Sequence, residues 1–541
     1  MRSLFRKKPL VGVVSDDGGH GTGLHKVLNL RDLTFFGVAA IIGGGTFSAI
    51  GNACASGGPG VVFLYIICAV ACGFTALCYA EFASRVPVSG SAYTYAYVSF
   101  GEIFAWIIGW ALIMEYSIGN IYIAFSWSGY FTNLVPGIPE WLTTNYLDAK
   151  AMLTEEAKLA WQNAPMIGSL KVIFDLPAVI INILITALVY VGTKESKNFS
   201  NAMVVIKLSI ILLVILVGMF YIDFNNWQPF MPNGFGGVMA GVSAVFFAYI
   251  GFDAVSTLAE ESKNPQKDLP RGMIYSLVIC TGIYIILALI LTGMVSYEYL
   301  GVNDPLAEIF KMKGIKWMLW IVSIAAVIAM TSVLLVFQMG QPRIWMTMSR
   351  DGLMPRKFAE VHPRFKTPGF ATIVTGLVVG IPILFTNEKF ILDFTSIGTL
   401  FAFVLVCGGV LVLPRKEKEE GKFHLPYINS KYWFPAIVFA VYGFLIYKYP
   451  DFFKSQFQIT SENIETALPM LIFFAVCIIM VVLSYIKEFS LIPVLGLVSC
   501  CYLLTGMAWS NWKWFFVWLV IGLVFYFSYG RKHSKLNVQA K

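Results

Sequence analysis

The sequence has little charge and few of the groups that build metal or redox centres. Charged residues make up 13% of its 541 residues, against about 25% in a typical soluble domain. The five histidines all lie outside the long apolar segments, and the nine cysteines show neither a metal-ligand spacing nor a disulfide framework. We therefore expect no metal, no cofactor and no set of soluble domains. With 57% hydrophobic residues, the composition predicts a polytopic membrane protein.

Apolar segments that are long enough to cross a bilayer, which takes roughly 20 residues, follow one another along the chain. Their recurrence predicts an all-α polytopic membrane protein with about fourteen transmembrane helices. The candidate spans cover residues 32–54, 60–84, 101–131, 174–193, 201–222, 236–259, 272–296, 316–341, 369–386, 391–413, 432–448, 466–486, 491–508 and 512–530.

Lysine and arginine are distributed unevenly between the two sides of this topology. Twenty-eight of the 39 fall on the side that carries both chain ends, and ten fall on the other side. Because cytoplasmic loops are enriched in these residues, we place both termini in the cytoplasm and the protein in the inner or plasma membrane. The net charge of +8 then follows from the loops and indicates no nucleic-acid binding. The large outer loop, 132–173, predicts a surface helix near residues 153–161.

The first span contains the run Gly43-Gly44-Gly45-Thr46, about 17 Å from its start at 1.5 Å per residue. Glycine is a poor helix former, so three in succession predict an unwound segment near the middle of the membrane. Lipid cannot satisfy the freed N–H and C=O groups, which must face protein, a cavity or a polar ligand. The alternative is close helix packing through small residues, which is common in membrane bundles.

The sixth span carries a second, weaker signal for a break, at Gly251 in the segment 246–253. The first span enters from inside and the sixth, five spans later, enters from outside, so two units of five spans each are inverted relative to each other. Interrupted first helices in two inverted halves indicate a transporter with its site at the midplane. The alternative is an accidental glycine in an apolar helix. The expected divisions are an N-terminal tail at 1–31, repeats at 32–222 and 223–413, peripheral spans at 414–530 and a C-terminal tail at 531–541.

Two broken helices suit the zwitterionic head of an amino acid. Half-helix N-termini offer free N–H groups and partial positive charge to a carboxylate, here at Gly44, Gly45 and Thr46. Half-helix C-termini offer carbonyls to an ammonium group. The carbonyls expected to bind the amino group are those of Ala40, Ile41, Phe247 and Ile250, and Gly43 and Ala248 complete the predicted backbone site.

Ionisable residues inside spans are expensive and mark candidate functional positions. Glu115 lies about 21 Å into the third span, too deep to reach water easily. It could receive the side chain of a cationic substrate. The alternative is a protonated glutamic acid that is hydrogen-bonded to a neighbouring helix.

Lys207 lies about 9 Å into the fifth span, so it could extend to the cytoplasmic interface. The alternative is an inward-pointing lysine on the carbonyls of the broken first helix, where it could load and release a proton. Asp253 follows the second break and either contributes to the site or caps the second half-helix. Glu260 and Glu261 are expected to form surface or gate ion pairs with residues such as Arg85.

Several motifs together resemble the cationic amino acid transporter family of the amino acid–polyamine–organocation (APC) superfamily. They include Gln341-Pro342-Arg343 and Asp351-Gly352-Leu353. The resemblance covers nearly the whole chain, with further matching segments at 37–47, 78–93, 251–253, 260–266, 397–400 and 526–530.

This resemblance implies a five-plus-five inverted-repeat transporter fold that works by alternating access. It also implies that Phe247 is the aromatic gate over the substrate and that Glu115 lies near the side-chain pocket. Lys207 matches a lysine that takes the place of a sodium ion in bacterial relatives and is linked to proton coupling, so a bacterial member is expected. One departure is Thr46, where the family usually has an aliphatic residue.

The sequence thus predicts a secondary transporter for proton-coupled uptake of cationic L-amino acids across the lipid bilayer, with a small single-span membrane protein as a further candidate partner. A neutral or broad-specificity transporter, an exchanger and a non-transporting amino acid receptor are the alternatives. An enzyme is disfavoured because the spans contain no paired catalytic carboxylates and no nucleophile–base arrangement.

Overall fold

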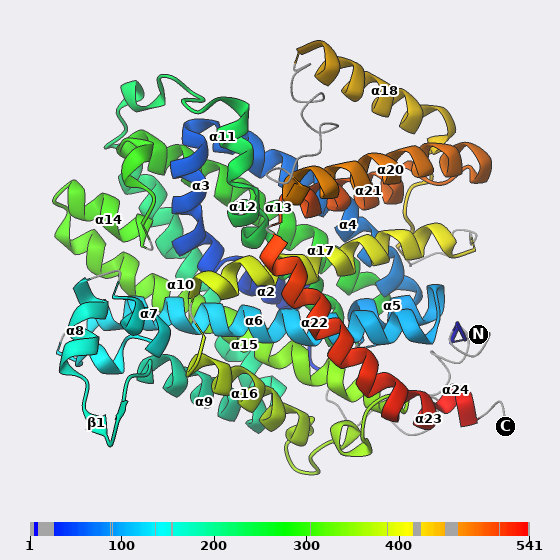
Figure 1. Cartoon of the computed structure of the whole chain (residues 1–541), viewed down its shortest axis with the longest axis horizontal. Coiled ribbons are helices and arrows are strands. Elements are labelled where there is room, and N and C mark those ends of the chain that lie inside the picture. Colours follow the sequence, from blue (N-terminus) through cyan, green and yellow to red (C-terminus); the bar gives the residue numbers. More distant parts are fainter. Residues whose placement is uncertain are drawn as a thin grey trace.

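The computed structural model describes residues 5–8, 26–86, 88, 90–135, 137–152, 155–302, 304–386, 388–414, 423–448, 464–507 and 509–538. Long helices such as α6 and α17 run roughly along the horizontal of Figure 1. We call the end with residues 5–8 and 531–538 the tail side, and the opposite end, with residues 137–175, the loop side. The tail side is the one that the lysine and arginine distribution predicts to be cytoplasmic.

The first span is interrupted where the glycine run begins. Helix α2 (Leu30–Ile41) ends at Ile42, whose backbone is extended with φ −82° and ψ 98°. The chain resumes as the π-helical turn η1 (Gly45–Ala49) and continues as α3 (Ile50–Gly57). The helix therefore stops before the glycines, and its last carbonyls lose their partners in a further helical turn.

The sixth span is also interrupted. Helices α11 (Gly234–Ala240) and α12 (Val242–Tyr249) are followed by Ile250 in extended conformation and then by η5 (Phe252–Glu261). Gly251 has φ +117°, a conformation that side chains with a Cβ rarely adopt. Both predicted interruptions are thus present in the structure.

The other long helices overlap the predicted segments, and shorter helices lie between them. They are η2 (Gly58–Gly60), α4 (Val61–Arg85), α5 (Ser91–Ser99), α6 (Glu102–Leu134), η3 (Glu140–Leu142), α7 (Tyr146–Ala151), α8 (Glu155–Asn163), α9 (Leu176–Val191), α10 (Thr193–Met219), η4 (Phe224–Trp227), α13 (Pro265–Met294), η6 (Tyr297–Tyr299), α14 (Pro305–Met312), α15 (Lys316–Arg350), η7 (Arg356–Ala359), α16 (Gly369–Ile383), α17 (Glu388–Val412), α18 (Ser430–Lys448), α20 (Ile464–Lys487), α21 (Leu491–Thr505), α22 (Trp509–Phe525), η8 (Tyr526–Gly530), α23 (Arg531–His533) and α24 (Lys535–Val538).

Within the described part of the chain, eight helices are long and apolar enough to cross a membrane, or nine if a bent pair is one span, and four apolar helices are shorter. The prediction of an all-α polytopic membrane protein is confirmed. The count of fourteen spans and the division into repeats at 222 and 413 stay predictions.

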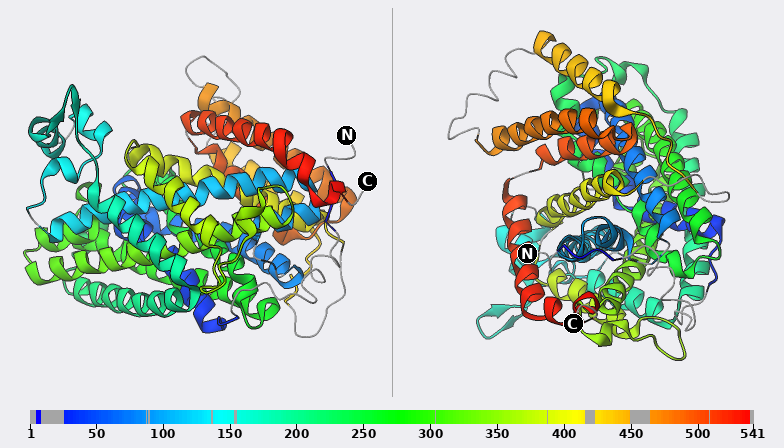
Figure 2. Two further views of the ribbon diagram at one scale, coloured as in Figure 1. Left: turned by 90° about the horizontal axis from the view of Figure 1, so that it is seen from below. Right: turned by 90° about the vertical axis from the view of Figure 1, so that its right-hand side faces the viewer.

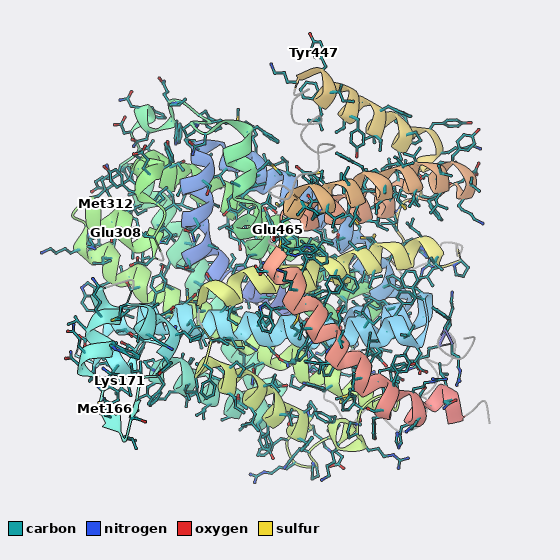
Figure 3. The ribbon with its side chains drawn as sticks, viewed as in Figure 1. Met166, Lys171, Glu308, Met312, Tyr447 and Glu465 are labelled. Carbon is teal, nitrogen blue, oxygen red and sulfur yellow. The ribbon has the colours of Figure 1, made fainter. Side chains whose placement is uncertain are left out.

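The bundle has a buried centre and an apolar exterior. Helices α6 and α15 lie in the buried interior, whereas α18 packs on α20 and α21 at the edge of the bundle, as Figures 1 and 2 show. Tyr447, at the end of α18, points away from the protein in Figure 3. Exposed apolar side chains at the edge of the bundle suit contact with lipid, because lipid tails are as apolar as these side chains.

The loop side carries a small unit with a core of its own. The strands β1 (Met166–Ile167) and β2 (Leu170–Lys171) pair as an antiparallel hairpin beside the predicted surface helix, α8. Ala160 of α8 is part of a separate buried cluster in this unit. Figure 3 shows Met166 and Lys171 at the outer edge of the molecule.

Candidate functional site

The two breaks lie against each other. A Cβ atom added to Gly45 would overlap the backbone of Ala248, and one added to Gly251 would come within 2.7 Å of the Ala40 Cβ. Close packing therefore favours glycine at both breaks, and backbone conformation also favours it at Gly251. Close packing through small residues was the alternative to a ligand site. In the structure, such packing brings the two breaks together.

The first break leaves some of its backbone donors open. The N–H groups of Thr46 and Phe47 donate to the Gly43 carbonyl at 2.9 and 3.0 Å. Within the described residues, the N–H groups of Gly44 and Gly45 make no hydrogen bond. Two of the three donors predicted for a carboxylate are thus available, and the third, at Thr46, is already used.

Tyr284 of α13 joins the two breaks, and the sequence did not reveal this role. Its hydroxyl lies 2.8 Å from the carbonyl oxygens of both Ile41 and Ala248, and it accepts from the Thr46 hydroxyl at 3.2 Å. The Ile41 carbonyl, predicted for a substrate amino group, therefore has a protein partner. A tyrosine deep in an apolar span was the available signal, because a buried hydroxyl needs a partner.

Aromatic side chains cover the first break. The rings of Phe247 and Tyr122 meet edge to face with their centroids 4.9 Å apart. A Cβ on Gly44 would lie 3.6 Å from Phe247 and 3.1 Å from Tyr122. The predicted gate residue thus lies over the glycine run, and Tyr122 of α6 is a second covering ring that the sequence did not indicate. Its role as a gate stays a prediction.

Lys207 of α10 is fully buried and points into the first break. Its Nζ donates to the carbonyls of Ala39 at 3.1 Å and Ile42 at 2.7 Å, and to Ser332 Oγ of α15 at 2.9 Å. These carbonyls are free because α2 ends there. The side chain does not extend to the interface, so the inward alternative describes its position, and Ser332 is a partner that the sequence did not identify.

Two buried carboxyl groups lie close enough to interact electrostatically. Glu115 of α6 lies against α17, where a Cβ added to Gly398 would be 3.6 Å from the Glu115 Cβ, and Asp253 lies in the first turn of η5. Within the described residues, Glu115 Oε2 and Asp253 Oδ2 make no hydrogen bond. Negative charge at Asp253 is favourable in this first turn, but in the described part of the chain no side-chain hydrogen bond caps η5.

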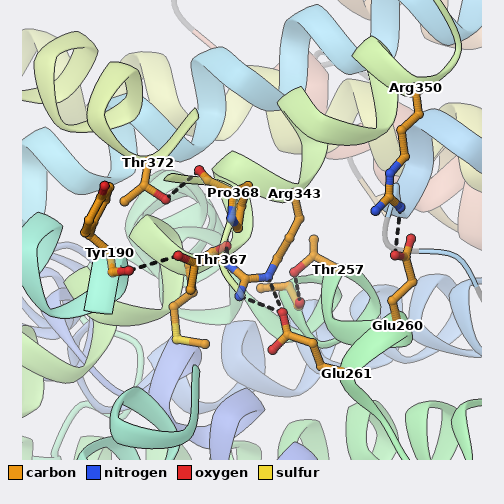
Figure 4. Close-up of polar contacts among 11 residues, drawn as sticks. Tyr190, Thr257, Glu260, Glu261, Arg343, Arg350, Thr367, Pro368 and Thr372 are labelled. Atoms are coloured by element: carbon orange, nitrogen blue, oxygen red, sulfur yellow. Dashed lines mark hydrogen bonds and ion pairs between the residues drawn. The ribbon is translucent and has the colours of Figure 1, made fainter. Parts of the chain in front are cut away.

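Two ion pairs join η5 to α15 on the tail side, as Figure 4 shows. Arg343 lies 2.6 Å from Glu261 with both side chains fully buried, and Arg350 lies 2.7 Å from Glu260. The expected pairing of these glutamates with Arg85 is wrong. Arg85 instead reaches one helical turn back to Glu81 at 2.5 Å, because residues four apart on a helix are neighbours.

Gly45→Ala is expected to weaken substrate binding about 10-fold, because overpacking typically costs ~1–3 kcal/mol and the added methyl would push Ala248 and η1 apart. Gly282→Ala in α13 is the matched control, since a Cβ there meets nothing within 4 Å. Binding of labelled amino acids to the purified protein measures both. Equal affinities for the two variants would contradict a site at the paired breaks.

The sequence matches known protein families along nearly its whole length. A model described as amino acid permease matches residues 28–480, and a model described as the C-terminus of AA_permease matches residues 490–534. The chain therefore belongs to the amino acid permease family, and its broken helices in an all-α membrane bundle fit that family's fold.

Individual relatives extend this assignment. The chain is 38% identical to the branched-chain amino acid permease BcaP of Bacillus subtilis over 99% of both chains. It is 37% identical to the methylthioribose transporter of the same organism over 99% of this chain and all of the relative. It is 30% identical to the vacuolar cationic amino acid transporter 4 of Arabidopsis thaliana over 99% of this chain and 97% of the relative.

The resemblance to the cationic amino acid transporters is thereby confirmed. The protein is a multi-pass membrane transporter of amino acids and not an enzyme. The family assignment does not identify the substrate or the coupling ion, because the relatives are named for different transported compounds.

Proposed function

We propose that this transporter takes up cationic L-amino acids together with protons by alternating access, in the cell membrane with both termini cytoplasmic. The observation that carries the proposal is Lys207, whose buried ammonium group lies on free carbonyls of the first break. The same break offers the open N–H groups of Gly44 and Gly45. A titratable group and two open backbone donors thus lie at the same break.

The substrate head group would bind between the breaks. Its carboxylate would accept from the Gly44 and Gly45 N–H groups at the positive end of η1, where anions are favoured. Its amino group would approach the carbonyls of Ala40 and Ile250, because Tyr284 occupies that of Ile41. The cationic side chain would extend toward the free oxygens of Glu115 and Asp253.

Proton coupling would run through the amine of Lys207. The protonated amine holds Ala39 and Ile42 at the end of α2, so it stabilises the present position of that helix. The neutral amine has one fewer N–H and no charge, and it binds the same carbonyls less strongly. Loss of the proton would then release α2, which is how a proton could bias the two access states.

A second candidate is a transporter of neutral amino acids. Glu115 and Asp253 are both buried, and burial of two neighbouring carboxyl groups disfavours their joint ionisation. The relative with 38% identity is named as a branched-chain permease. A protonated acid pair would suit an uncharged substrate side chain, because two neighbouring carboxyl groups readily share a proton.

Counterflow in proteoliposomes separates these functions. A panel of labelled arginine, lysine, ornithine, leucine and alanine is tested with and without an inward proton gradient. Preferential uptake of the cationic amino acids that rises with the gradient would support the proposal. Leucine preference would favour the neutral transporter, uptake without gradient dependence would favour an exchanger, and binding without flux would indicate a receptor.

Glu115→Gln is expected to weaken arginine uptake about 10-fold more than alanine uptake, because a charge-assisted hydrogen bond contributes about 1.5–3 kcal/mol. The measurement is the ratio of kcat/KM for the two substrates. Glu298→Gln, on an exposed turn of the loop side, is the control and should leave the ratio unchanged. Equal losses for arginine and alanine would remove Glu115 from side-chain recognition.

A further inference from the structure

The two terminal segments contact each other on the tail side. Arg6 donates to the Leu536 carbonyl at 2.8 Å and to the Asn537 side chain at 3.0 Å. These residues are 530 or more positions apart, yet Figure 2 shows both chain ends at the same end of the molecule. The contact is therefore part of the tertiary fold and not of local chain geometry.

The N-terminal segment is fitted onto the start of α6. The Glu102 N–H donates to the Arg6 carbonyl at 3.0 Å, and the Lys8 N–H donates to the Tyr97 carbonyl at 3.3 Å. Gly101 has φ +106°, and a Cβ there would lie 2.7 Å from the carbonyl of Phe5. Glycine at this position allows the backbone of residues 5–8 to approach closely.

The C-terminal segment packs against the start of α6 and against the turn that follows α15. Ser534 donates to the Glu102 carboxylate at 2.5 Å, and Tyr526 donates to it at 2.8 Å. Gly352, with φ +82°, faces the His533 carbonyl so closely that a Cβ would overlap it. A second glycine with positive φ therefore allows the second terminal segment to dock.

Both segments meet at Asp351, directly after the last residue of α15. Lys8 pairs with its carboxylate at 2.7 Å, Tyr93 donates to the same carboxylate at 2.8 Å, and the Lys535 N–H donates to its carbonyl at 3.1 Å. The preceding residue, Arg350, forms the ion pair with Glu260 of η5. The terminal segments are thus anchored one residue away from a contact between α15 and η5.

We propose that residues 5–8 and 531–538 form a terminal clasp that positions Arg350 for its ion pair with Glu260 and so helps to keep the tail side closed. Helix ends fray unless they are tied down. The carbonyls of Thr347, Met348 and Ser349 at the end of α15 accept from the turn at residues 351–353, which the clasp holds through Asp351. The clasp supplies a backbone hydrogen bond and a cation at this C-terminus, where positive charge is favourable. Lys8 and Arg6 are positioning residues, since neither touches the paired breaks.

The proposal rests on alternating access, because only then does a closed tail side have to open. Opening would separate η5 from α15 and break the pair of Arg350 with Glu260. A clasp that fixes the end of α15 lowers the population of the open state. A larger fraction of the protein is then in the state that binds a ligand from the loop side, so the apparent affinity for that ligand rises.

Hydrogen exchange of the purified full-length protein tests the clasp without substrate or proton gradient. Lys8→Ala should speed exchange about 5-fold in segments 347–353, 531–537 and 258–263, as expected for loss of a partly buried ion pair. Lys7→Ala, an exposed neighbour, is the matched control, and Lys8→Arg should restore most of the protection. Exchange in Lys8→Ala that equals the Lys7→Ala control would overturn the clasp.

A double-variant cycle tests the link to the ion pair. In a Glu260→Gln background, Lys8→Ala should no longer speed exchange at 258–263, although 531–537 should still exchange faster. An unchanged effect at 258–263 would overturn the positioning of Arg350.

Uptake kinetics test the effect of the clasp on transport. In uptake of labelled L-arginine or L-leucine, whichever is transported, Lys8→Ala should raise the apparent KM about three- to five-fold and change kcat less than about two-fold. A fall in kcat alone would also contradict the proposal.

Discussion

Lys207→Ala is expected to reduce proton-driven uptake at least about 100-fold while substrate binding stays measurable. The ammonium group makes charge-assisted hydrogen bonds to the carbonyls of Ala39 and Ile42, each contributing about 1.5–3 kcal/mol. Alanine leaves both buried carbonyls without this partner and removes the group that carries the proton. Initial uptake rates in proteoliposomes at several external pH values measure the effect, with binding followed separately in detergent.

Two further variants make this result specific. Ser332→Ala removes one of the three Lys207 partners and should reduce uptake less, by up to about 10-fold. Lys313→Ala, on the exposed loop side, is the matched lysine control and should behave as the unchanged protein. Uptake by Lys207→Ala that still rises at acid pH would show that another group couples the proton.

Arg343→Met is expected to destabilise the protein by about 3–5 kcal/mol, because it removes the buried cation that pairs with the buried Glu261 carboxylate. Both side chains of this pair are fully buried, and Arg343 makes a further hydrogen bond to the Met339 carbonyl. The free energy of unfolding in detergent, or the monodisperse fraction after heating, measures the loss. The matched variant Arg350→Met at the more exposed pair should cost no more than about 1 kcal/mol.

Replacing both partners of the buried pair distinguishes stability from function. The double variant Arg343→Met with Glu261→Met should regain most of the lost stability, since an apolar pair often replaces a buried ion pair at little cost. We expect it to fold but to transport poorly, because the two access states would no longer differ by this ion pair. Full activity in a stable double variant would mean that transport does not depend on this ion pair.

The local features of the site could be predicted from the sequence. The glycine run from Gly43 and the single Gly251 indicated interruptions, and the structure has both. The inward alternative for Lys207 also describes its observed position. These predictions succeeded because a helix break depends on the backbone preferences of the residues at the break, which can be read from a few neighbouring positions.

The partners of these features could not be predicted in the same way. Nothing in the sequence connects Tyr284 with Ile41 and Ala248, which lie 243 and 36 positions away. The chain offers several arginines to the glutamates after the second break, and the one named in the prediction, Arg85, was the wrong one. Which long side chain meets which carboxylate depends on how the helices cross, and ridge-into-groove packing allows several angles.

By itself, the sequence determined that this chain is a helical membrane protein, where its apolar segments lie and where two of its helices are interrupted. Hydrophobicity and backbone preference are properties of short segments, so they can be read from the sequence without knowing the rest of the structure. The tertiary structure alone decided that Lys207 meets Ile42 and Ser332, that Arg343 meets Glu261, and that the terminal clasp closes on Asp351. These contacts join distant parts of the chain, and only the packing of the complete bundle brings them within hydrogen-bonding distance.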